Sequence, residues 1–201
     1  KKLCIFGAGG FAKEIMWMAS DLGYNVEMFV DRYEGPDFCG RPVKTAESFD
    51  PQIHCAVIAI GSPLLRKKIY ESLPKETEFP NLIHHSCQYD KQGVKFGKGA
   101  VVCMNVIITT NVVFGDFIQL NLSSHVSHDC TTGDFFTTAP MVSVCGTNKI
   151  GDCVYFGTHA SSINNIDICS NVTIGANACV VKSIDQPGVY VGTPAKKIKD
   201  I

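Results

Sequence analysis

The chain has 201 residues, of which 45% are hydrophobic and 18% charged, so it can bury a core in one domain or in two small ones. The net charge is -1 and no basic run is present that would neutralise a row of phosphates, so nucleic acid is not an expected partner. No apolar stretch approaches the roughly 20 residues that a membrane span needs, so no segment is expected to cross a bilayer.

The sequence contains ten cysteines, but no secretory signal precedes Lys1 and no pair has the C-x-x-C spacing of a zinc or redox site. We therefore expect reduced thiols in a cytoplasmic protein, where each cysteine packs as a small apolar side chain.

The N-terminal part of the chain alternates short apolar runs with helical segments. Residues 3–6, 26–30 and 56–60 predict strands, and residues 13–22 and 63–73 have the apolar spacing of helices. This order predicts a small parallel sheet, and thus a Rossmann-like α/β half-domain over residues 1–82.

A glycine-rich turn, Gly7-Ala8-Gly9-Gly10-Phe11-Ala12, follows the first predicted strand. In this G-x-G-x-x-A pattern, backbone N–H groups at a helix start can bind a diphosphate, and Asp31 after the next strand can accept from a ribose or a base. A turn without a ligand also fits the pattern. An NAD-dependent oxidoreductase is an alternative. Two observations argue against it: the α/β unit is only about half of a double mononucleotide fold, and no catalytic domain other than the repeat follows it.

From Phe96 to Asp185 the chain repeats every six residues without an insertion. The first positions of the fifteen hexapeptides are large and apolar at twelve places, with Thr132, Thr138 and Ser162 as the exceptions. The fifth positions are mostly small or aliphatic, although Ser124 and Asn148 are polar. A strict period of six fits neither a helix nor a hairpin sheet, and it predicts a parallel β-helix.

In a β-helix each triangular coil contains three short strands, so positions that differ by three hexapeptides lie one above the other with a spacing of about 4.8 Å. Fifteen hexapeptides predict five coils. Flat faces on such a stack favour association with further copies, so we predict a homotrimer.

A polar cluster at residues 121–129 is the candidate reaction centre. His128 occupies an outward third position, and Gly146 lies three hexapeptides later. An exposed imidazole beside a glycine N–H provides what acyl transfer needs, namely a base for the incoming amine or hydroxyl and a donor for the oxyanion that forms on a thioester carbonyl. Asp129 would orient and stabilise the imidazolium.

Metal catalysis and a cysteine nucleophile have less support in the sequence. A metal shared by His125 and His128 lacks a third ligand with matching spacing, so no metal is expected. Cys130 and Cys145 have no basic neighbour that would favour a thiolate, so we expect direct attack without an acyl-enzyme.

The glycine turn with Asp31 and the His128-Asp129 pair are accompanied by three further motifs. They are Ile60-Gly61-Ser62 with Arg66-Lys67-Lys68, Phe79-Pro80-Asn81-Leu82-Ile83-His84, and the terminal Val191-Gly192-Thr193-Pro194-Ala195-Lys196. Over nearly the whole chain, the motifs resemble those of bacterial sugar acyltransferases of the sialic-acid O-acyltransferase and bacillosamine or perosamine N-acetyltransferase type. The resemblance implies a left-handed β-helix over residues 83–201 that carries the acyltransferase activity.

The resemblance also implies acetyl-CoA-dependent transfer to the 4-amino group of a nucleotide-linked 4-amino-4,6-dideoxy sugar, with His128 as general base. The N-terminal domain would bind the nucleotide, with the glycine turn (Gly7, Gly9, Gly10) at the diphosphate and Asp31 near the base. We also count Gly61, Ser62 and Asn121 among the expected substrate-binding residues.

Coenzyme A would lie along the solenoid between neighbouring subunits, and the residues expected near it are Gly146, Gly175, Ala176, Pro194, Ala195 and Lys196. Two alternatives stay open. One is a sialic-acid O-acetyltransferase, whose acceptor is a hydroxyl, and the other is a non-catalytic trimeric scaffold that senses a nucleotide.

Overall fold

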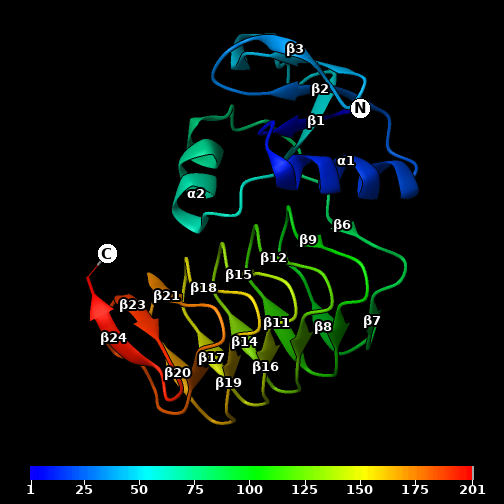
Figure 1. The fold of residues 1–201 in the computed structure, drawn as a ribbon. Helices are drawn as coiled ribbons and strands as arrows, with labels where there is room; N and C mark the ends of the chain where they lie inside the picture. The colour runs from blue at the N-terminus through cyan, green and yellow to red at the C-terminus, as the bar shows by residue number, and fades with distance from the viewer. Residues whose placement is uncertain (201) are drawn as a thin grey trace. The chain divides into compact units, whose positions relative to one another are not determined.

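The structure is a computed structural model that describes residues 1–200. The chain forms two compact units, Lys1–Leu82 and the part that begins at Ile83. Figure 1 shows strands and helices in the first unit and a stack of coils in the second. No helix within residues 1–200 is both long enough and apolar enough to cross a membrane.

The first unit contains one five-stranded sheet in the order β3-β4-β2-β1-β5. Strand β1 is parallel to both β2 and β5, and β2 is parallel to β4, as the predicted β-α-β order requires. The elements are β1 (Lys2–Phe6), α1 (Gly10–Asp21), β2 (Val26–Val30), β3 (Gly35–Phe38), β4 (Arg41–Lys44), the 3₁₀ turn η1 (Ala46–Ser48), β5 (His54–Ile58) and α2 (Pro63–Ser72).

The hairpin of β3 and β4 is absent from the sequence-based prediction. Its turn places Cys39 and Gly40 at φ 49° and 72°, in the left-handed region where an Asn-Gly pair would have been the usual signal. Strand β3 is also almost wholly exposed, so it lacks the apolar alternation by which strands are recognised.

The second unit is the parallel β-helix that the hexapeptide pattern predicts, left-handed as the family resemblance implies, and three sheets form its faces. One face contains β6 (Leu82–Ile83), β9 (Val101–Val102), β12 (Gln119–Leu120), β15 (Thr137–Thr138), β18 (Tyr155–Phe156), β21 (Val172–Ile174), β23 (Gly188–Val191) and the antiparallel β24 (Lys196–Lys199). The second contains β7 (Gln88–Tyr89), β10 (Ile107–Ile108), β13 (His125–Val126), β16 (Ser143–Val144), β19 (Ser161–Ser162) and β22 (Cys179–Val180). The third contains β8 (Val94–Lys95), β11 (Val112–Phe114), β14 (Thr131–Thr132), β17 (Lys149–Ile150) and β20 (Asp167–Ile168).

The period of six comes from the corners between these strands. Every sixth residue from Gly99 to Asn177 has a positive φ, between 54° and 67°. Glycine, Asn and Asp tolerate this conformation, and they occupy seven of these corners: Gly99, Asn105, Asn111, Asp129, Asn165, Asn171 and Asn177. The chain therefore turns after each short strand, and three turns close one coil.

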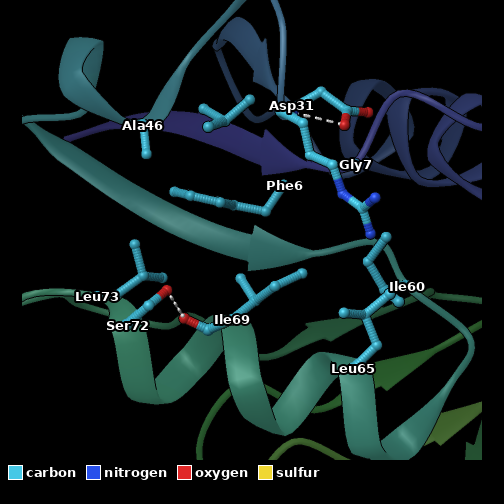
Figure 2. Close-up of a pocket in the computed structure, with 11 residues that line it drawn as sticks. Phe6, Gly7, Asp31, Ala46, Ile60, Leu65, Ile69, Ser72 and Leu73 are labelled. Carbon is cyan, nitrogen blue, oxygen red and sulfur yellow. Dashed lines mark hydrogen bonds between the residues drawn. The ribbon is translucent and has the colours of Figure 1, made fainter.

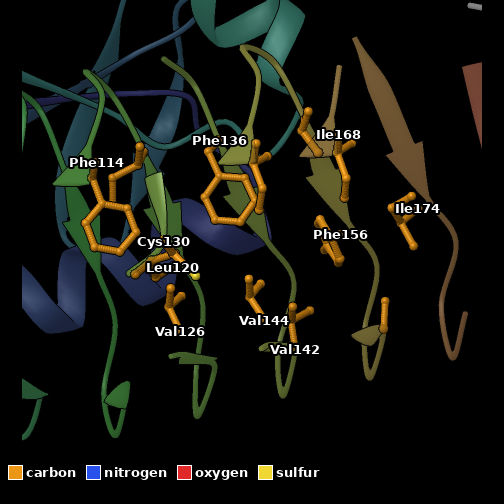
Figure 3. Close-up of a cluster of buried hydrophobic side chains, with 14 of the residues drawn as sticks. Phe114, Leu120, Val126, Cys130, Phe136, Val142, Val144, Phe156, Ile168 and Ile174 are labelled. Carbon is orange, nitrogen blue, oxygen red and sulfur yellow. The ribbon is translucent and has the colours of Figure 1, made fainter. Parts of the chain in front are cut away.

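The interior of the coils is filled by the first and fifth positions of the hexapeptides. Figure 3 shows aromatic and aliphatic side chains, among them Phe114, Leu120, Phe136 and Phe156, stacked through successive coils. These four side chains are at most 3% exposed, so the stacked coils share one continuous core.

The solenoid begins one coil earlier than the repeat indicates, because β6, β7 and β8 form a coil ahead of Phe96. In this coil Gln88 pairs with Ile107, one position beyond the regular spacing, whereas Val94 pairs with Val112 at the regular spacing. This shift places the coil outside the hexapeptide register, so the count of five coils was too low.

Candidate functional site

The corner between β13 and β14 carries the two side chains of the candidate reaction centre. Asp129 has φ 59°, and its Oδ2 lies 2.7 Å from Nδ1 of the preceding His128. The side chains of His128 and Asp129 are 51% and 48% exposed, so the pair is open to a ligand.

Asn111 lies one coil below Asp129 and completes the arrangement. Its Nδ2 donates to Asp129 Oδ1 at 2.6 Å. This hydrogen bond, and secondly the one from His128, lowers the pKa of the Asp129 carboxyl. An ionised carboxylate only accepts hydrogen bonds, so His128 Nδ1 must donate. In the neutral imidazole, Nε2 is then the free basic nitrogen.

Gly146 lies one coil above His128, against the imidazole. A Cβ at position 146 would come within 2.7 Å of Cε1 and 2.8 Å of Nε2, so the ring occupies space that any other residue would fill. Within residues 1–200, no carbonyl or side chain accepts from the Gly146 N–H. The N–H groups at several other corners are free as well, but here a free N–H adjoins an imidazole with an unoccupied nitrogen.

The neighbouring cysteine and histidine side chains are less suited to chemistry. Burial raises the pKa of the Cys130 thiol, and its Sγ donates to Cys145 O at 3.2 Å, so a thiolate is disfavoured. Burial lowers the pKa of His125, whose ring contacts Ser143 and Ser127. The described part of the chain has no group of three or more His, Cys, Asp or Glu side chains that could hold a metal ion.

A cavity of about 490 Å³ lies within the first unit, at the ends of β1 and β2. Figure 2 shows Phe6 and Ile69 on its walls, with Gly7 and Asp31 at one side. Its lining is mostly apolar, which suits a flat ring system with a few polar groups at the rim. The lining residues are Phe6, Gly7, Val30, Asp31, Arg32, Ala46, Ile60, Leu65, Ile69, Ser72 and Leu73.

Asp31 fixes the glycine turn beside this cavity. Its Oδ2 accepts from the Ala8 N–H at 2.9 Å, and its Oδ1 accepts from the Arg32 N–H at 2.7 Å. Gly7 has φ 107°, and a Cβ there would come within 2.9 Å of Ile60 Cδ1. The close approach of the two loops therefore requires glycine at position 7.

The other predicted residues of this unit lie at two helix starts. Helix α1 has Gly9 as its N-cap, Gly10 as its first residue and no acidic side chain in its first turn, so its N–H groups are available to an anion. At α2 the Ser62 hydroxyl accepts from the Leu65 N–H, and buried Arg66 donates to Ile60 O at 2.7 Å next to Gly61. Ser62 is therefore already occupied as a helix cap.

The residues predicted to contact coenzyme A fall into two groups. Gly146 is at the His128 corner. The corner after β21 contains Gly175 and Ala176, and the terminal segment with Pro194 packs near it, since Ala195 N donates to Cys179 O at 2.8 Å. Exposed Lys196 begins β24.

Asn121 is separate from His128, at the corner between β12 and β13 rather than the one between β13 and β14. Its Oδ1 accepts from the Leu122 N–H at 2.7 Å. One chain therefore does not bring Asn121 to the imidazole. The sequence-based site also omitted Asn111 as the partner of Asp129, although the same spacing along the chain had pointed to Gly146.

Residues 2–73 match the family described as the PglD N-terminal domain. The GDP-perosamine N-acetyltransferase of Escherichia coli O157:H7 is 33% identical over 103 residues, which cover 51% of this chain and 47% of that protein. The chain thus aligns with about half the length of this curated relative.

Two of the solved structures that match the chain cover nearly its whole length. The acetyltransferase domain of PglB from Neisseria gonorrhoeae is 30% identical with a TM-score of 0.91, and the match covers 98% of this chain and 99% of that one. PerB from Caulobacter crescentus, solved in complex with CoA and GDP-perosamine, is 26% identical with a TM-score of 0.92, covering 98% and 97% of the two chains. The α/β unit, the hexapeptide β-helix and these matches show that the chain belongs to the nucleotide-linked amino-sugar acyltransferase family.

Proposed function

We propose that this protein transfers an acetyl group from acetyl-CoA to the amino group of a nucleotide-linked sugar, specifically a 4-amino-4,6-dideoxy sugar. The observation that carries the proposal is the position of His128, whose Nδ1 lies 2.7 Å from Asp129 Oδ2 while its other ring atoms lie against Gly146. The resemblance to PerB, solved with CoA and GDP-perosamine, supports both substrates.

The residues at this corner suit a thioester donor. Acetyl-CoA supplies an acetyl group whose C–S bond breaks as the new C–N bond forms. His128 Nε2 accepts the proton that the sugar amine loses on attack and can return it to the departing sulfur. The Gly146 N–H donates to the carbonyl oxygen as negative charge develops there, and Asp129 stabilises the imidazolium. Because Gly146 has no side chain, the acetyl carbonyl can approach both the Gly146 N–H and the His128 imidazole.

The first unit is the proposed nucleotide-sugar domain. We propose that the apolar cavity binds the nucleobase and that Asp31 makes a polar contact with the ligand at the rim of the cavity. The N–H groups at Gly9 and Gly10 would bind the diphosphate. Gly7 and Gly61 keep the two loops small. The Ser62 hydroxyl accepts from the Leu65 N–H and is proposed to donate its own proton to a sugar or phosphate. Asn121, in the second unit, is a further proposed sugar or phosphate contact.

We further propose a homotrimer with its reaction sites between subunits. In one chain the segment at Gly175, Ala176 and residues 194–196 lies at a different corner from Gly146, so a coenzyme A that contacts both groups must cross a face of the solenoid. A neighbouring copy that covers this face would enclose the cofactor and would explain why the His128–Asp129 pair is half exposed in the single chain.

The test is release of free thiol from acetyl-CoA in the presence of UDP-, dTDP- and GDP-linked 4-amino sugars, with sialic acid and CMP-sialic acid as controls. Turnover with one amino sugar supports the proposal and names its nucleotide. Turnover with sialic acid alone would replace the amine acceptor by a hydroxyl. No thiol release with any acceptor, in a protein that still binds a nucleotide sugar, would favour the non-catalytic scaffold.

A further inference from the structure

Two polar pairs interrupt the apolar interior of the β-helix, and they explain most of the exceptions in the hexapeptide pattern. Asn148 is 0% exposed and its Nδ2 donates to Ser162 Oγ at 2.7 Å. Thr138 and Ser124, both 1% exposed, share a hydroxyl hydrogen bond of 3.0 Å. Such groups are costly to bury, so each pair calls for a structural reason.

Each pair replaces one backbone hydrogen bond of the ladder. At the second hexapeptide position the N–H normally donates to a carbonyl of the following coil, as Ser127 does to Val144 at 2.9 Å. Within the described coils this pairing is replaced at two corners. Asn121 N donates to Thr138 Oγ1 at 3.0 Å, and Cys145 N donates to Ser162 Oγ at 3.3 Å. The two corners thus modified carry Asn121 and Gly146, which are both predicted site residues.

Asn148 is fully paired in this position. Its second Nδ2 proton goes to Ile163 O at 3.0 Å, and its Oδ1 accepts from the Ile166 N–H at 3.0 Å. It therefore joins the Gly146 corner to the next coil and holds the Ser162 hydroxyl against Cys145 N. At the equivalent places in the same sheet as Ser162, the chain has Val126, Val144 and Val180, which offer no acceptor.

A third interior group sets the orientation of the peptide between Cys145 and Gly146. The Cys145 carbonyl accepts from the Sγ of fully buried Cys130 at 3.2 Å, so it points into the coil. In a planar trans peptide the N–H points away from the carbonyl. The Gly146 N–H is therefore directed outward, on the side where the imidazole lies.

We propose that Asn148 and Ser162 are positioning residues that, together with Cys130, fix the Cys145–Gly146 peptide and direct the Gly146 N–H at the acetyl carbonyl. This inference rests on the proposed acetyl transfer. Neither side chain touches a substrate. Each acts through the backbone of the corner, which is held from the other side by Thr147 N donating to His128 O at 2.9 Å.

The test compares Ser162→Val, the double variant Asn148→Val/Ser162→Val, and Ser162→Thr, which retains the hydroxyl. The single Val variant leaves the Asn148 amide buried without one partner. The double variant removes both side chains, but it also takes the partners from the Cys145 N–H, Ile163 O and the Ile166 N–H, so its Tm is measured and kcat is compared in folded protein only. Val154→Ala is the control, because Val154 is also 0% exposed and lies six residues after Asn148 at another corner.

We expect kcat of the double variant to fall about 10- to 100-fold, since misplacing one oxyanion donor costs this much, while KM for acetyl-CoA and the pH profile stay unchanged. Ser162→Thr restores kcat. Val154→Ala lowers Tm but leaves kcat near the wild-type value. A wild-type kcat in a folded double variant, or an equal loss of kcat in Val154→Ala at a similar loss of Tm, overturns the inference.

A second readout separates this inference from the proposed function. The backbone amide of Gly146, observed by NMR, should become more mobile or change its shift in the double variant but not in Val154→Ala. An unchanged Gly146 amide overturns the positioning role even if the enzyme is active. A wild-type protein that acetylates no amino sugar would instead refute the proposed function.

Discussion

The imidazole of His128 occupies the place that a side chain at Gly146 would need, because a Cβ there would come within 2.7 Å of Cε1. The two residues hold the same hexapeptide position in successive coils. The half-exposed ring can swing away, whereas the backbone of the corner cannot.

Gly146→Ala should therefore fold but displace the imidazole. We expect a Tm close to that of the wild type and kcat about 10²-fold lower, the scale at which small misplacements of reacting groups act. Thiol release and the His128 Cε1–H signal in NMR measure the two effects. Full turnover in Gly146→Ala would mean that the glycine is not needed beside the ring.

His128→Ala removes the proposed base and should lower turnover by about 10² to 10⁴ with little change in stability, since the side chain is half exposed. His159→Asn is the matched control, because it alters an exposed histidine at another coil corner with φ 59°. Equal activity of both variants and the wild type would exclude His128 from the mechanism.

Asn111→Ala should raise the pKa of Asp129, whose carboxyl is kept ionised first by the Asn111 hydrogen bond and then by His128. Because the folded-state pKa lies below the unfolded value, the carboxylate stabilises the fold above the unfolded pKa, and that contribution is lost as the pH falls through the folded pKa. The titration of the Asp129 carboxyl carbon measures the change, which should move the midpoint upward. If the titration midpoint of Asp129 is the same in Asn111→Ala as in the wild type, the assigned role of Asn111 is wrong.

Gly9→Val should weaken nucleotide-sugar binding and leave acetyl-CoA binding intact. Position 9 has extended backbone, with φ -102°, and a Cβ there meets no atom within 4 Å, so the fold accepts a side chain. The added methyl groups would instead obstruct the N–H groups at the start of α1. Titration calorimetry with each ligand separates the effects, and equal loss of both would indicate misfolding.

Most of the solenoid could be predicted from the sequence, because its period is local. The positive φ at every sixth residue and the apolar interior positions both leave a signature in the chain. The coil at β6–β8 was missed because a single extra residue, between Gln88 and its partner Ile107, breaks the register. The exposed β3–β4 hairpin left no apolar pattern to detect.

The spacing between successive coils explains which parts of the site could be predicted from the sequence. Positions that differ by three hexapeptides are neighbours in a β-helix, so the sequence alone pairs His128 with Gly146, and it could have paired Asn111 with Asp129 likewise. The link from Asn148 through Ser162 to Cys145 does not follow this spacing, and it depends on side-chain direction inside the coil. No repeat pattern carries that information.

The amine acceptor and the role of His128 are tested most directly with two acceptors that differ at a single heavy atom. The nucleotide-linked 4-amino sugar that supports turnover is assayed beside its 4-hydroxy counterpart, with acetyl-CoA in both, and thiol release and product mass are measured. We expect one acetyl group to be added to the amino sugar, this activity to be lost in His128→Ala, and the hydroxy sugar not to be turned over. Acetylation of the hydroxy sugar alone, or undiminished acetylation by His128→Ala, would contradict this expectation.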